Sequence, residues 1–389
     1  MTQQTIRILT LIESATVTGP ARNLIEFASA ARRAEAGPPA VEVTILTYRR
    51  GPDESPLALA AREAGLPVIT VAERRRWDTR VFPQLRQAIA RHNPDILETR
   101  NVKSHFLVRM LGLNRKYPWV AWNHGYTATS WLDRTYTQLD RWSLRGAYRM
   151  VTVCRPFADR LVALGVPREK ITILHNSVKP FVKPEAEQVD QLRRSLALSN
   201  DEAMILSVGR LSYEKGHADL LRAGAALATM PEASRFRIVI VGDGPERDAL
   251  LGLASQLGID KQLTLAGFQR DTKPYYALAT LVAVPSHSEG SPNVVLEAMA
   301  AGLPIVANAV GGVPEILEED VTGLTVPARN ADAMAQALRR TLSDPELRNR
   351  LGPAARARAL GEHTPEAYRT KLAGFYQSVL RSRQPTTDN

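Results

Sequence analysis

Short apolar runs rich in β-branched residues alternate along the chain with stretches in which apolar residues recur every three or four positions. The first run, residues 6–12, ends near a turn at residues 18–20, and a helical pattern carrying Leu24 and Phe27 follows. The pattern predicts five more strands in the first half: 41–46, 67–71, 96–98, 120–122 and 150–153. Strands and helices that alternate in this way predict a doubly wound α/β fold, a parallel sheet covered on both faces by helices.

The alternation stops over residues 176–200, where Pro180 and Pro184 indicate a linker that leads into a helix. It then restarts and predicts a second set of strands: 203–208, 236–241, 263–266, 281–284, 304–307 and 324–326. The sequence therefore predicts an N-terminal Rossmann-like domain (1–178), a C-terminal one (179–364), and a C-terminal helix and tail (365–389) that pack back on the first domain. We expect the two domains to face a central cleft, because ligands of open α/β folds bind at the carboxyl ends of the strands.

The composition is that of an ordinary globular protein large enough for two cores. Of 389 residues, 44% are hydrophobic and 23% are charged. No apolar run approaches the roughly 18–20 residues that a membrane-spanning helix requires, and the first residues lack the pattern of a secretory signal. The single cysteine, Cys154, excludes an internal disulfide and a cysteine-based zinc site. These features lead us to expect a cytoplasmic location.

The net charge of +10 is unevenly distributed. Residues 1–180 hold 27 of the 50 Lys and Arg residues but only 15 of the 40 Asp and Glu residues. Such an excess suits an anionic partner: nucleic acid, acidic lipid or a phosphorylated substrate. If residues 131–149 form a helix, four arginines share one face: Arg134, Arg141, Arg145 and Arg149. That face predicts peripheral contact with an anionic membrane or with a polyprenyl-phosphate-type acceptor, although a helix docked on its own sheet with a solvated arginine face explains it equally well.

The most informative stretch is residues 286–299. Ser291 followed by Pro292 predicts an N-cap and the first position of a helix. Glu297 lies among apolar residues of that helix, and a buried carboxylate needs a hydrogen-bond donor. Glu289 precedes the helix, whose N-terminus favours an anion. Two carboxylates beside an anion-binding helix start indicate a ligand with both hydroxyl and phosphate groups, such as a nucleotide sugar.

Two further loops fit the same ligand. Arg210 and Lys215 follow a strand that ends at Val208, and two cations there can hold a diphosphate, although alone they are also typical of a solvated loop. A turn containing Gly242 and Gly244 follows the next strand, and either glycine could serve the turn alone.

As a set, these motifs resemble the retaining family 4 (group 1) glycosyltransferases, which have the GT-B fold. The resemblance rests on the following segments: Gly209-Arg210-Leu211, Glu214-Lys215-Gly216, Gly242-Asp243-Gly244-Pro245, Glu289 and Glu297 in an E-x7-E spacing, residues 297–306, and Gly311-Gly312-Val313-Pro314-Glu315. It runs through most of residues 203–330. The first half is similar more loosely, at the glycine turn near Gly19, at His124-Gly125 and at residues 165–176.

The resemblance implies a role for each of these positions. Arg210 and Lys215 would hold the leaving diphosphate, Glu289 the hydroxyls of the donor sugar, and Glu297 the ribose. His124, from the first domain, would approach the anomeric centre, although a histidine after a strand is as often a polar core group. Further contacts to donor or acceptor would come from Gly19, Gly209, Gly242, Gly244, Ser291, Asn293 and Val294. The other histidines considered are expected to be structural: His105, His175, His217 and His287.

Two positions depart from the family pattern and bear on which sugar is bound. Pro292 stands where the family usually has glycine, and Pro20 follows Gly19 where a second small residue is usual. Pro292 offers no N–H to a sugar hydroxyl, so the backbone of Ser291 or Asn293 would have to replace it.

The sequence thus predicts a metal-independent, cofactor-free retaining transfer of a hexose from a UDP-sugar or GDP-sugar to a glycan, lipid-linked or other acceptor, in polysaccharide biosynthesis. A nucleotide-sugar 2-epimerase of the same fold is the alternative enzyme, but no clear acid and base set for proton abstraction is present. A nucleic-acid-binding module is a third interpretation. The sequence contains neither a zinc-knuckle pattern nor an aromatic RNA-binding pattern, so no nucleic-acid partner is expected.

Overall fold

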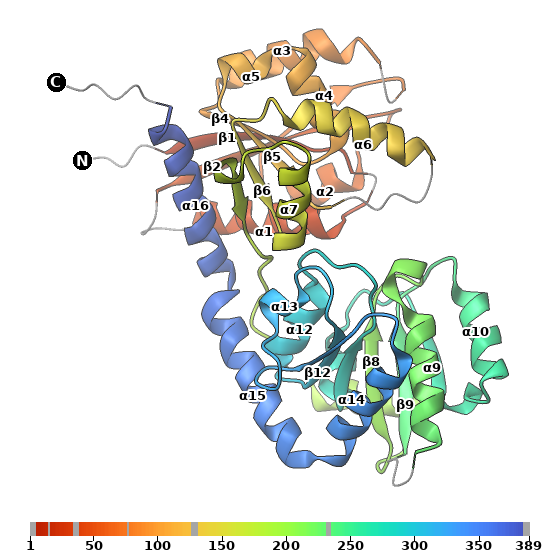
Figure 1. Ribbon diagram of the computed structural model, residues 1–389. Helices are drawn as coiled ribbons and strands as arrows, with labels where there is room; N and C mark the ends of the chain where they lie inside the picture. Colours follow the sequence, from red (N-terminus) through yellow and green to blue (C-terminus); the bar gives the residue numbers. More distant parts are fainter. Residues whose placement is uncertain are drawn as a thin grey trace. The chain divides into compact units, whose positions relative to one another are not determined.

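The computed structural model describes residues 5–14, 16–33, 39–75, 78–125, 131–230 and 235–383 (Figure 1). The chain divides into two compact units, each built on one parallel sheet. The first unit contains the chain up to Asn176 together with the segment from Pro365 onward, and the second runs from Ser177 to Thr364. The chain thus leaves the first unit once and returns to it once.

The first unit has a seven-stranded parallel sheet in the order β3-β2-β1-β4-β5-β6-β7. The strands are β1 (Ile6–Leu11), β2 (Val41–Arg49), β3 (Val68–Ala72), β4 (Ile96–Thr99), β5 (Trp119–Asn123), β6 (Arg149–Thr152) and β7 (Ile171–Ile173). The helices are α1 (Gly19–Arg33), α2 (Pro56–Glu63), α3 (Val81–His92), α4 (Val102–Met110), α5 (Leu113–Lys116), α6 (Trp131–Leu144), α7 (Arg155–Ala163) and α16 (Pro365–Arg381). Strand β1 pairs with both β2 and β4, so the strand order reverses between β1 and β4.

The second unit has a six-stranded parallel sheet in the order β10-β9-β8-β11-β12-β13. The strands are β8 (Ala203–Val208), β9 (Phe236–Val241), β10 (Leu263–Gly267), β11 (Leu281–Val284), β12 (Ile305–Asn308) and β13 (Leu324–Val326). The helices are α8 (Ala186–Ser195), α9 (His217–Ala228), α10 (Arg247–Gln256), α11 (Lys273–Leu278), α12 (Asn293–Ala301), α13 (Val313–Ile316), α14 (Ala331–Ser343) and α15 (Pro345–Glu362). Here the order reverses between β8 and β11.

Both sheets are buried on both faces, which explains why their strands are continuous apolar runs rather than alternating ones. In β1, Ile8, Leu9 and Leu11 are all fully buried, although neighbouring side chains point to opposite faces. Separate apolar clusters cover the two faces of each sheet. The predicted class, two doubly wound parallel-sheet domains, is confirmed. Among the described residues, no helix has both the length and the apolar character needed to cross a bilayer.

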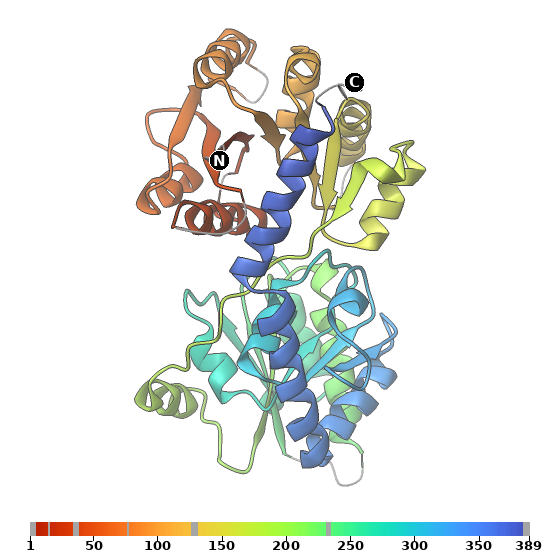
Figure 2. The ribbon, with the colours of Figure 1, turned by 90° about the vertical axis from the view of Figure 1, so that its left-hand side faces the viewer.

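The C-terminal helix α16 belongs to the core of the first unit (dark blue in Figure 2). Its Tyr368 and Tyr376 pack around Phe27 of α1, with ring centroids 6.1 and 6.2 Å apart. Leu372 is fully buried in the same cluster. A segment at the end of the chain therefore completes the core that the first strands begin.

One predicted element is wrong in part. The helix expected over residues 131–149 ends at Leu144, and the amides of Gly146 and Ala147 bond to carbonyls of the last turn. Arg149 is the first residue of β6 and pairs with Val120. The helix has ended at Leu144 and a buried strand follows, so Arg145 and Arg149 do not share a helical face with Arg141. The side chain of Arg134 lies outside the described residues. The membrane contact predicted on a four-arginine face loses its geometric basis.

Strand β7, residues Ile171–Ile173, is missing from the predicted set of strands. It is three residues long and pairs only with β6 at the edge of the sheet. Its residues are half-buried. A run this short carries too little periodicity to be recognised in the sequence.

Candidate active site

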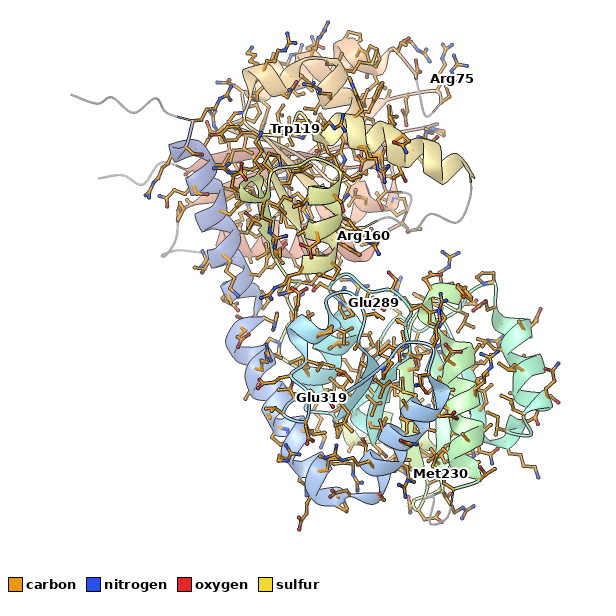
Figure 3. All side chains as sticks on the ribbon, viewed as in Figure 1. Arg75, Trp119, Arg160, Met230, Glu289 and Glu319 are labelled. Carbon is orange, nitrogen blue, oxygen red and sulfur yellow. The ribbon has the colours of Figure 1, made fainter. Side chains whose placement is uncertain are left out.

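The second unit brings its chemical groups together where its strand order reverses. Strands β8 and β11 are neighbours, but the chain leaves β8 toward β9 on one side and leaves β11 toward β12 on the other. Their loops therefore diverge, and such a point in an open α/β sheet is the usual place for a ligand. Arg210 and Lys215 lie in the β8 loop and Glu289 lies in the β11 loop. Figure 3 shows Glu289 and Met230, which follows α9, at opposite ends of this unit.

The centre of this region is an ion pair between Lys215 and Glu289. Lys215 Nζ donates to Glu289 Oε1 at 2.7 Å, and Ser286 Oγ donates to the same oxygen at 2.7 Å. The Glu289 side chain is 9% exposed and the Lys215 side chain is 27% exposed. The residues predicted to hold the diphosphate and the sugar are thus in direct contact. An ammonium group has three donors, so Lys215 can keep this bond and still donate to an anion.

Arg210 is exposed in the same loop as Lys215, and its backbone is fixed by a buried histidine. His217 Nε2 donates to the Arg210 carbonyl oxygen at 3.3 Å, and Nδ1 lies 3.5 Å from Ser207 Oγ. Burial lowers the pKa of His217 to about 4, so the ring is neutral at physiological pH. The expectation that His217 is structural agrees with this geometry, and the role it serves is to fix the loop that carries Arg210.

The loops of the site meet through glycines. Gly242 has φ +148°, and a Cβ placed there would lie 1.9 Å from the carbonyl oxygen of Gly209. Gly311 has φ +56°, and a Cβ there would lie 1.5 Å from the carbonyl oxygen of Glu289. Only glycine permits these contacts. The Gly244 amide donates to the Asp243 carboxylate at 2.8 Å and closes the turn after β9.

Helix α12 begins one residue later than predicted. Pro292, with φ −71° and ψ 114°, is the N-cap residue and makes no side-chain capping bond; the helix starts at Asn293. The predicted cap, Ser291, is therefore wrong by one position, because the extended backbone of Pro292 keeps it outside the helix. Asn293 and Val294 form the first turn, whose N–H groups point out of the helix N-terminus. Ser291 is buried immediately before this turn.

Glu297 has the partner that its apolar surroundings require. Tyr276 of α11 donates its hydroxyl to Glu297 Oε2 at 2.8 Å. Burial raises the pKa of Tyr276 well above its usual value, and the Glu297 charge adds to the effect, so the hydroxyl keeps its proton. Glu297 itself is half-buried. The tyrosine thereby orients one carboxylate oxygen of Glu297.

Two supporting contacts of the Glu289 loop could not be read from the sequence. Asn308, at the end of β12, donates from Nδ2 to the carbonyl oxygens of Pro285 and Ser286 at 2.6 and 3.1 Å. His287 Nε2 lies 2.7 Å from Asp219 Oδ2 in α9. The partners are more than twenty residues apart in the chain, and no local pattern signals them.

In the first unit, His124 follows β5 and contacts the ring of Trp122, which in turn contacts Arg100. Its ring stacks on Trp122 at 5.6 Å with an interplanar angle of 17°, and the guanidinium carbon of Arg100 lies 4.0 Å from the Trp122 ring centroid. Burial, together with the Arg100 charge and His105, lowers the pKa of His124 to about 3. His124 is therefore neutral at physiological pH and can exchange hydrogen bonds, but it cannot act as a cation. Gly19, the other predicted site residue of this unit, is the first residue of α1.

A second group of charged residues, at the carboxyl edge of the first sheet, was not predicted from the sequence. Lys103 Nζ lies 2.5 Å from Glu73 Oε2 and 3.6 Å from Glu13 Oε1, and Arg50 Nε lies 2.8 Å from Glu73 Oε1. Lys103 and Glu73 are almost completely buried, while Arg50 is 44% exposed. We call these four residues the edge cluster. One of these residues follows each of the strands β1 to β4. The number of basic residues in the sequence does not show that these four side chains meet at one edge of the sheet.

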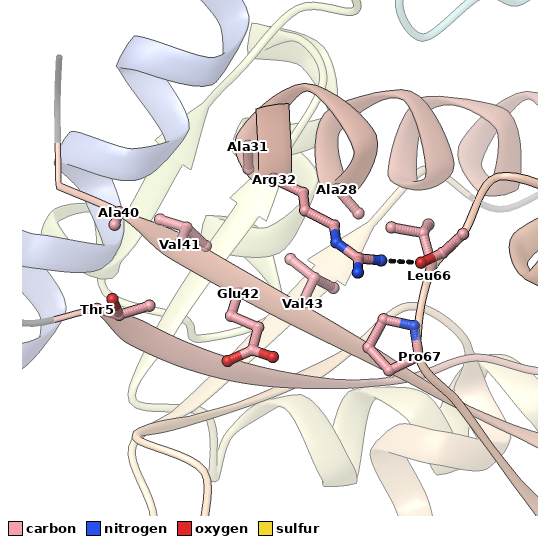
Figure 4. Close-up of a pocket in the computed structure, with 11 residues that line it drawn as sticks. Thr5, Ala28, Ala31, Arg32, Ala40, Val41, Glu42, Val43, Leu66 and Pro67 are labelled. Carbon is pink, nitrogen blue, oxygen red and sulfur yellow. Dashed lines mark hydrogen bonds between the residues drawn. The ribbon is translucent and has the colours of Figure 1, made fainter. Parts of the chain in front are cut away.

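A cavity of about 530 Å³ lies away from these groups (Figure 4). It is lined at the amino ends of the first strands by Thr5, Val41 and Pro67, and by Arg32 of α1, which donates to the Gly65 carbonyl. The site groups of this unit lie at the carboxyl ends. The cavity therefore does not belong to the candidate site. Among the described residues, no group of three His, Cys, Asp or Glu side chains is arranged to hold a metal ion.

Two doubly wound parallel-sheet units, with a cation–carboxylate pair at the strand-order reversal of the second, are typical of glycosyltransferases of GT-B fold, and two family models identify this class. The family model described as "Glycosyl transferases group 1" matches residues 188–358, and the one described as "Glycosyl transferase 4-like domain" matches residues 18–177. The chain belongs to the group 1 glycosyltransferase family.

Individual relatives agree with this assignment. The alpha-D-kanosaminyltransferase of Streptomyces kanamyceticus is 30% identical over 260 residues, which cover 64% of this chain and 67% of the relative. An uncharacterized glycosyltransferase of Methanocaldococcus jannaschii is 36% identical over 202 residues, covering 50% of this chain and only 51% of that protein. The crystal structure of Anabaena HepE in complex with UDP shares the fold with a TM-score of 0.82 at 20% identity, covering 96% of this chain and 100% of HepE.

Proposed function

We propose that this protein is a retaining hexosyltransferase that uses a UDP-sugar or GDP-sugar and needs no metal ion. The observation that carries the proposal is the Lys215–Glu289 pair at the strand-order reversal of the second unit, with Arg210 in the same β8 loop as Lys215. Cations and a carboxylate at one point suit a ligand that has a diphosphate next to sugar hydroxyls. The UDP bound to HepE, a protein of the same fold, supports a nucleotide donor.

In the proposed reaction, the acceptor oxygen forms a bond to the anomeric carbon as the bond from that carbon to the phosphate oxygen breaks. The acceptor proton passes to the leaving phosphate on the same face of the sugar, which retains the anomeric configuration without a carboxylate nucleophile. Arg210, Lys215 and the first-turn N–H groups of α12 stabilise the charge that develops on the diphosphate. Fixed cations can supply this stabilisation, which supports a metal-independent reaction.

Each remaining group has a place in this scheme. Glu297, oriented by Tyr276, binds the ribose hydroxyls, and Glu289 binds hydroxyls of the transferred sugar. His124 is neutral, so it offers hydrogen bonds to the sugar near the anomeric carbon rather than charge. We assign the acceptor to the carboxyl edge of the first sheet, where the edge cluster and the basic first half of the chain suit a glycan or a phosphorylated lipid-linked acceptor.

The donor is identified first, by thermal shift with a panel of UDP-sugars and GDP-sugars. A donor at a hundredfold excess over its Kd stabilises the protein by about 2.7 kcal/mol. With that donor, Arg210→Ala and Lys215→Ala should each lower the rate by about 10²–10³-fold, as for a lost oxyanion donor. Arg235→Ala is the matched control, because Arg235 forms an exposed pair with Asp201 in the same unit. Full activity of both site variants would refute the assignment.

Two further readouts separate the alternatives. Donor incubated without acceptor should remain unchanged, whereas a 2-epimerase would convert it to its epimer. Proton NMR of the product should show the anomeric configuration of the donor. An inverted product would exclude the proposed same-face transfer but leave the glycosyltransferase activity standing.

A further inference from the structure

A buried ion pair of the first unit, between Arg100 and Glu98, contacts the tryptophan on which His124 stacks. Arg100 Nε donates to Glu98 Oε1 at 2.7 Å, and the two side chains are 1% and 0% exposed. Thr10 of β1 donates to the same oxygen at 3.1 Å. Replacing such a pair by apolar residues is often neutral or stabilising, so its presence does not by itself explain stability.

The second carboxylate oxygen of Glu98 accepts a hydrogen bond from the C-terminal helix, α16. Tyr376 of α16 donates its hydroxyl to Glu98 Oε2, across 278 residues of sequence. Burial, with the Glu98 charge, raises the pKa of Tyr376 well above its usual value, so the phenol remains a donor. Glu98 is thus held on both oxygens, and it in turn fixes the Arg100 guanidinium.

Arg100 connects this pair to the candidate site through Trp122. Its guanidinium carbon lies 4.0 Å from the centroid of Trp122, and the indole carries the stacked His124 ring. A planar cation on an aromatic ring fixes both groups by cation–π attraction and by packing. The contacts therefore form a continuous series from α16 through Glu98, Arg100 and Trp122 to His124.

We propose that Tyr376 and the Glu98–Arg100 pair are positioning residues that hold Trp122, and through it His124, in the geometry required for sugar transfer. This inference rests on the proposed role of His124. It gives the C-terminal helix a part in the reaction, although none of its residues need touch a substrate.

The test compares Tyr376→Phe with Tyr148→Phe. Both remove one hydroxyl and keep the ring, and each hydroxyl joins the C-terminal segment to the rest of the first unit: Tyr376 donates to Glu98, and Tyr148 donates to Ser382 at 3.0 Å. Tyr376→Phe should lower kcat by between about tenfold and hundredfold, the range for a displaced positioning group. The donor KM should change much less than kcat, because the residues proposed to hold the diphosphate and the ribose lie in the second unit. Tyr148→Phe should leave both constants at the wild-type values.

NMR of the histidine ring protons gives a readout that does not depend on activity. The protein has seven histidines, and the His124 resonance is the one that His124→Gln removes. Tyr376→Phe should shift this resonance, because its position depends on stacking against Trp122, and Tyr148→Phe should not. If Tyr376→Phe fails to fold, Arg100→Lys replaces it: the charge remains, but the planar face on Trp122 is lost.

The outcomes separate this inference from the proposed function. A wild-type protein without transferase activity refutes the proposed function, and the NMR arm still decides whether the pair positions His124. An unshifted resonance, or a shifted resonance with unchanged kcat, overturns the positioning role. An equal loss of kcat in Tyr148→Phe also overturns it, because the effect would then come from docking of the helix in general.

Discussion

Replacing Lys215 with methionine should destabilise the second unit as well as slow the reaction. The substitution keeps most of the side-chain volume but removes the ammonium that donates to Glu289 at 2.7 Å. Among the described residues, Lys215 is the only cation within 4.0 Å of that carboxylate. Glu289 would keep its bond from Ser286, but its charge would be almost completely buried without a counter-ion.

The size of the effect follows from the burial of the two groups. A buried charged acceptor that loses a partner costs about 1–3 kcal/mol, and we expect about 2 kcal/mol because Lys215 itself is 27% exposed. For a unit of this size, that corresponds to a fall of about 4–8 °C in its Tm. Glu289→Gln should cost less than about 1 kcal/mol, because the ammonium left behind can reach water.

Calorimetry of the two single variants and of the double variant measures the coupling between Lys215 and Glu289. The double variant should recover most of the stability that Lys215→Met loses, because no charge is then buried without a partner. The activity should not recover, because both groups are proposed to contact the donor. Arg235→Met is the control, since its pair with Asp201 is more than 60% exposed on both sides and should contribute at most about 0.5 kcal/mol. Additive stability effects in the cycle would show that the ion pair does not form in solution.

Three further outcomes are expected. Gly242→Ala should destabilise the second unit by at least about 1–3 kcal/mol in urea unfolding, because the new Cβ would meet the Gly209 carbonyl oxygen at 1.9 Å; an unchanged midpoint would contradict the close approach. The free energy of unfolding should fall by about 3 kcal/mol on account of His217 as the pH drops from about 6.5 to 4, since its folded pKa of about 4 is lower than its unfolded value. Urea titrations of wild type and His217→Gln measure this term, which should vanish in the variant. Tyr276→Phe should weaken nucleotide binding about tenfold in calorimetric titration with little effect on kcat, because the oxygen that it orients on Glu297 is proposed to bind the ribose; unchanged affinity would refute that orientation.

The fold could be predicted well from the sequence because a parallel sheet buried on both faces leaves long apolar runs. Strand β9, for example, is apolar at every position of Phe236–Val241 except Arg237, and glycines follow it at the turn. The errors lie where local pattern competes with tertiary contacts. The arginines after Leu144 continue a helical spacing, but the helix ends at Leu144, and Arg149 pairs with β5 as the first residue of β6.

The candidate site was predictable only as separate motifs. The carboxylates Glu289 and Glu297 stand out because of the helix they flank, and Glu297 was expected to need the donor that Tyr276 provides. The contact between Lys215 and Glu289 was not predictable, because 74 residues separate them and their meeting depends on the order of β8 and β11. The edge cluster was not predictable for the same reason: its members come from four separate segments, the loops after β1, β2 and β3 and the first turn of α4.

The return of α16 to the first unit has a consequence for biosynthesis. The second unit is continuous in sequence, so it can fold as soon as residues 177–364 have left the ribosome. The first unit cannot complete its core at that stage, since Tyr368, Leu372 and Tyr376 follow the whole second unit in sequence. Until they arrive, the face that α1 presents to them exposes apolar surface, and Glu98 lacks its tyrosine. We therefore expect the first unit of a nascent chain to need chaperone protection until after the second unit is synthesised, and chains truncated before Pro365 to be degraded rather than to accumulate.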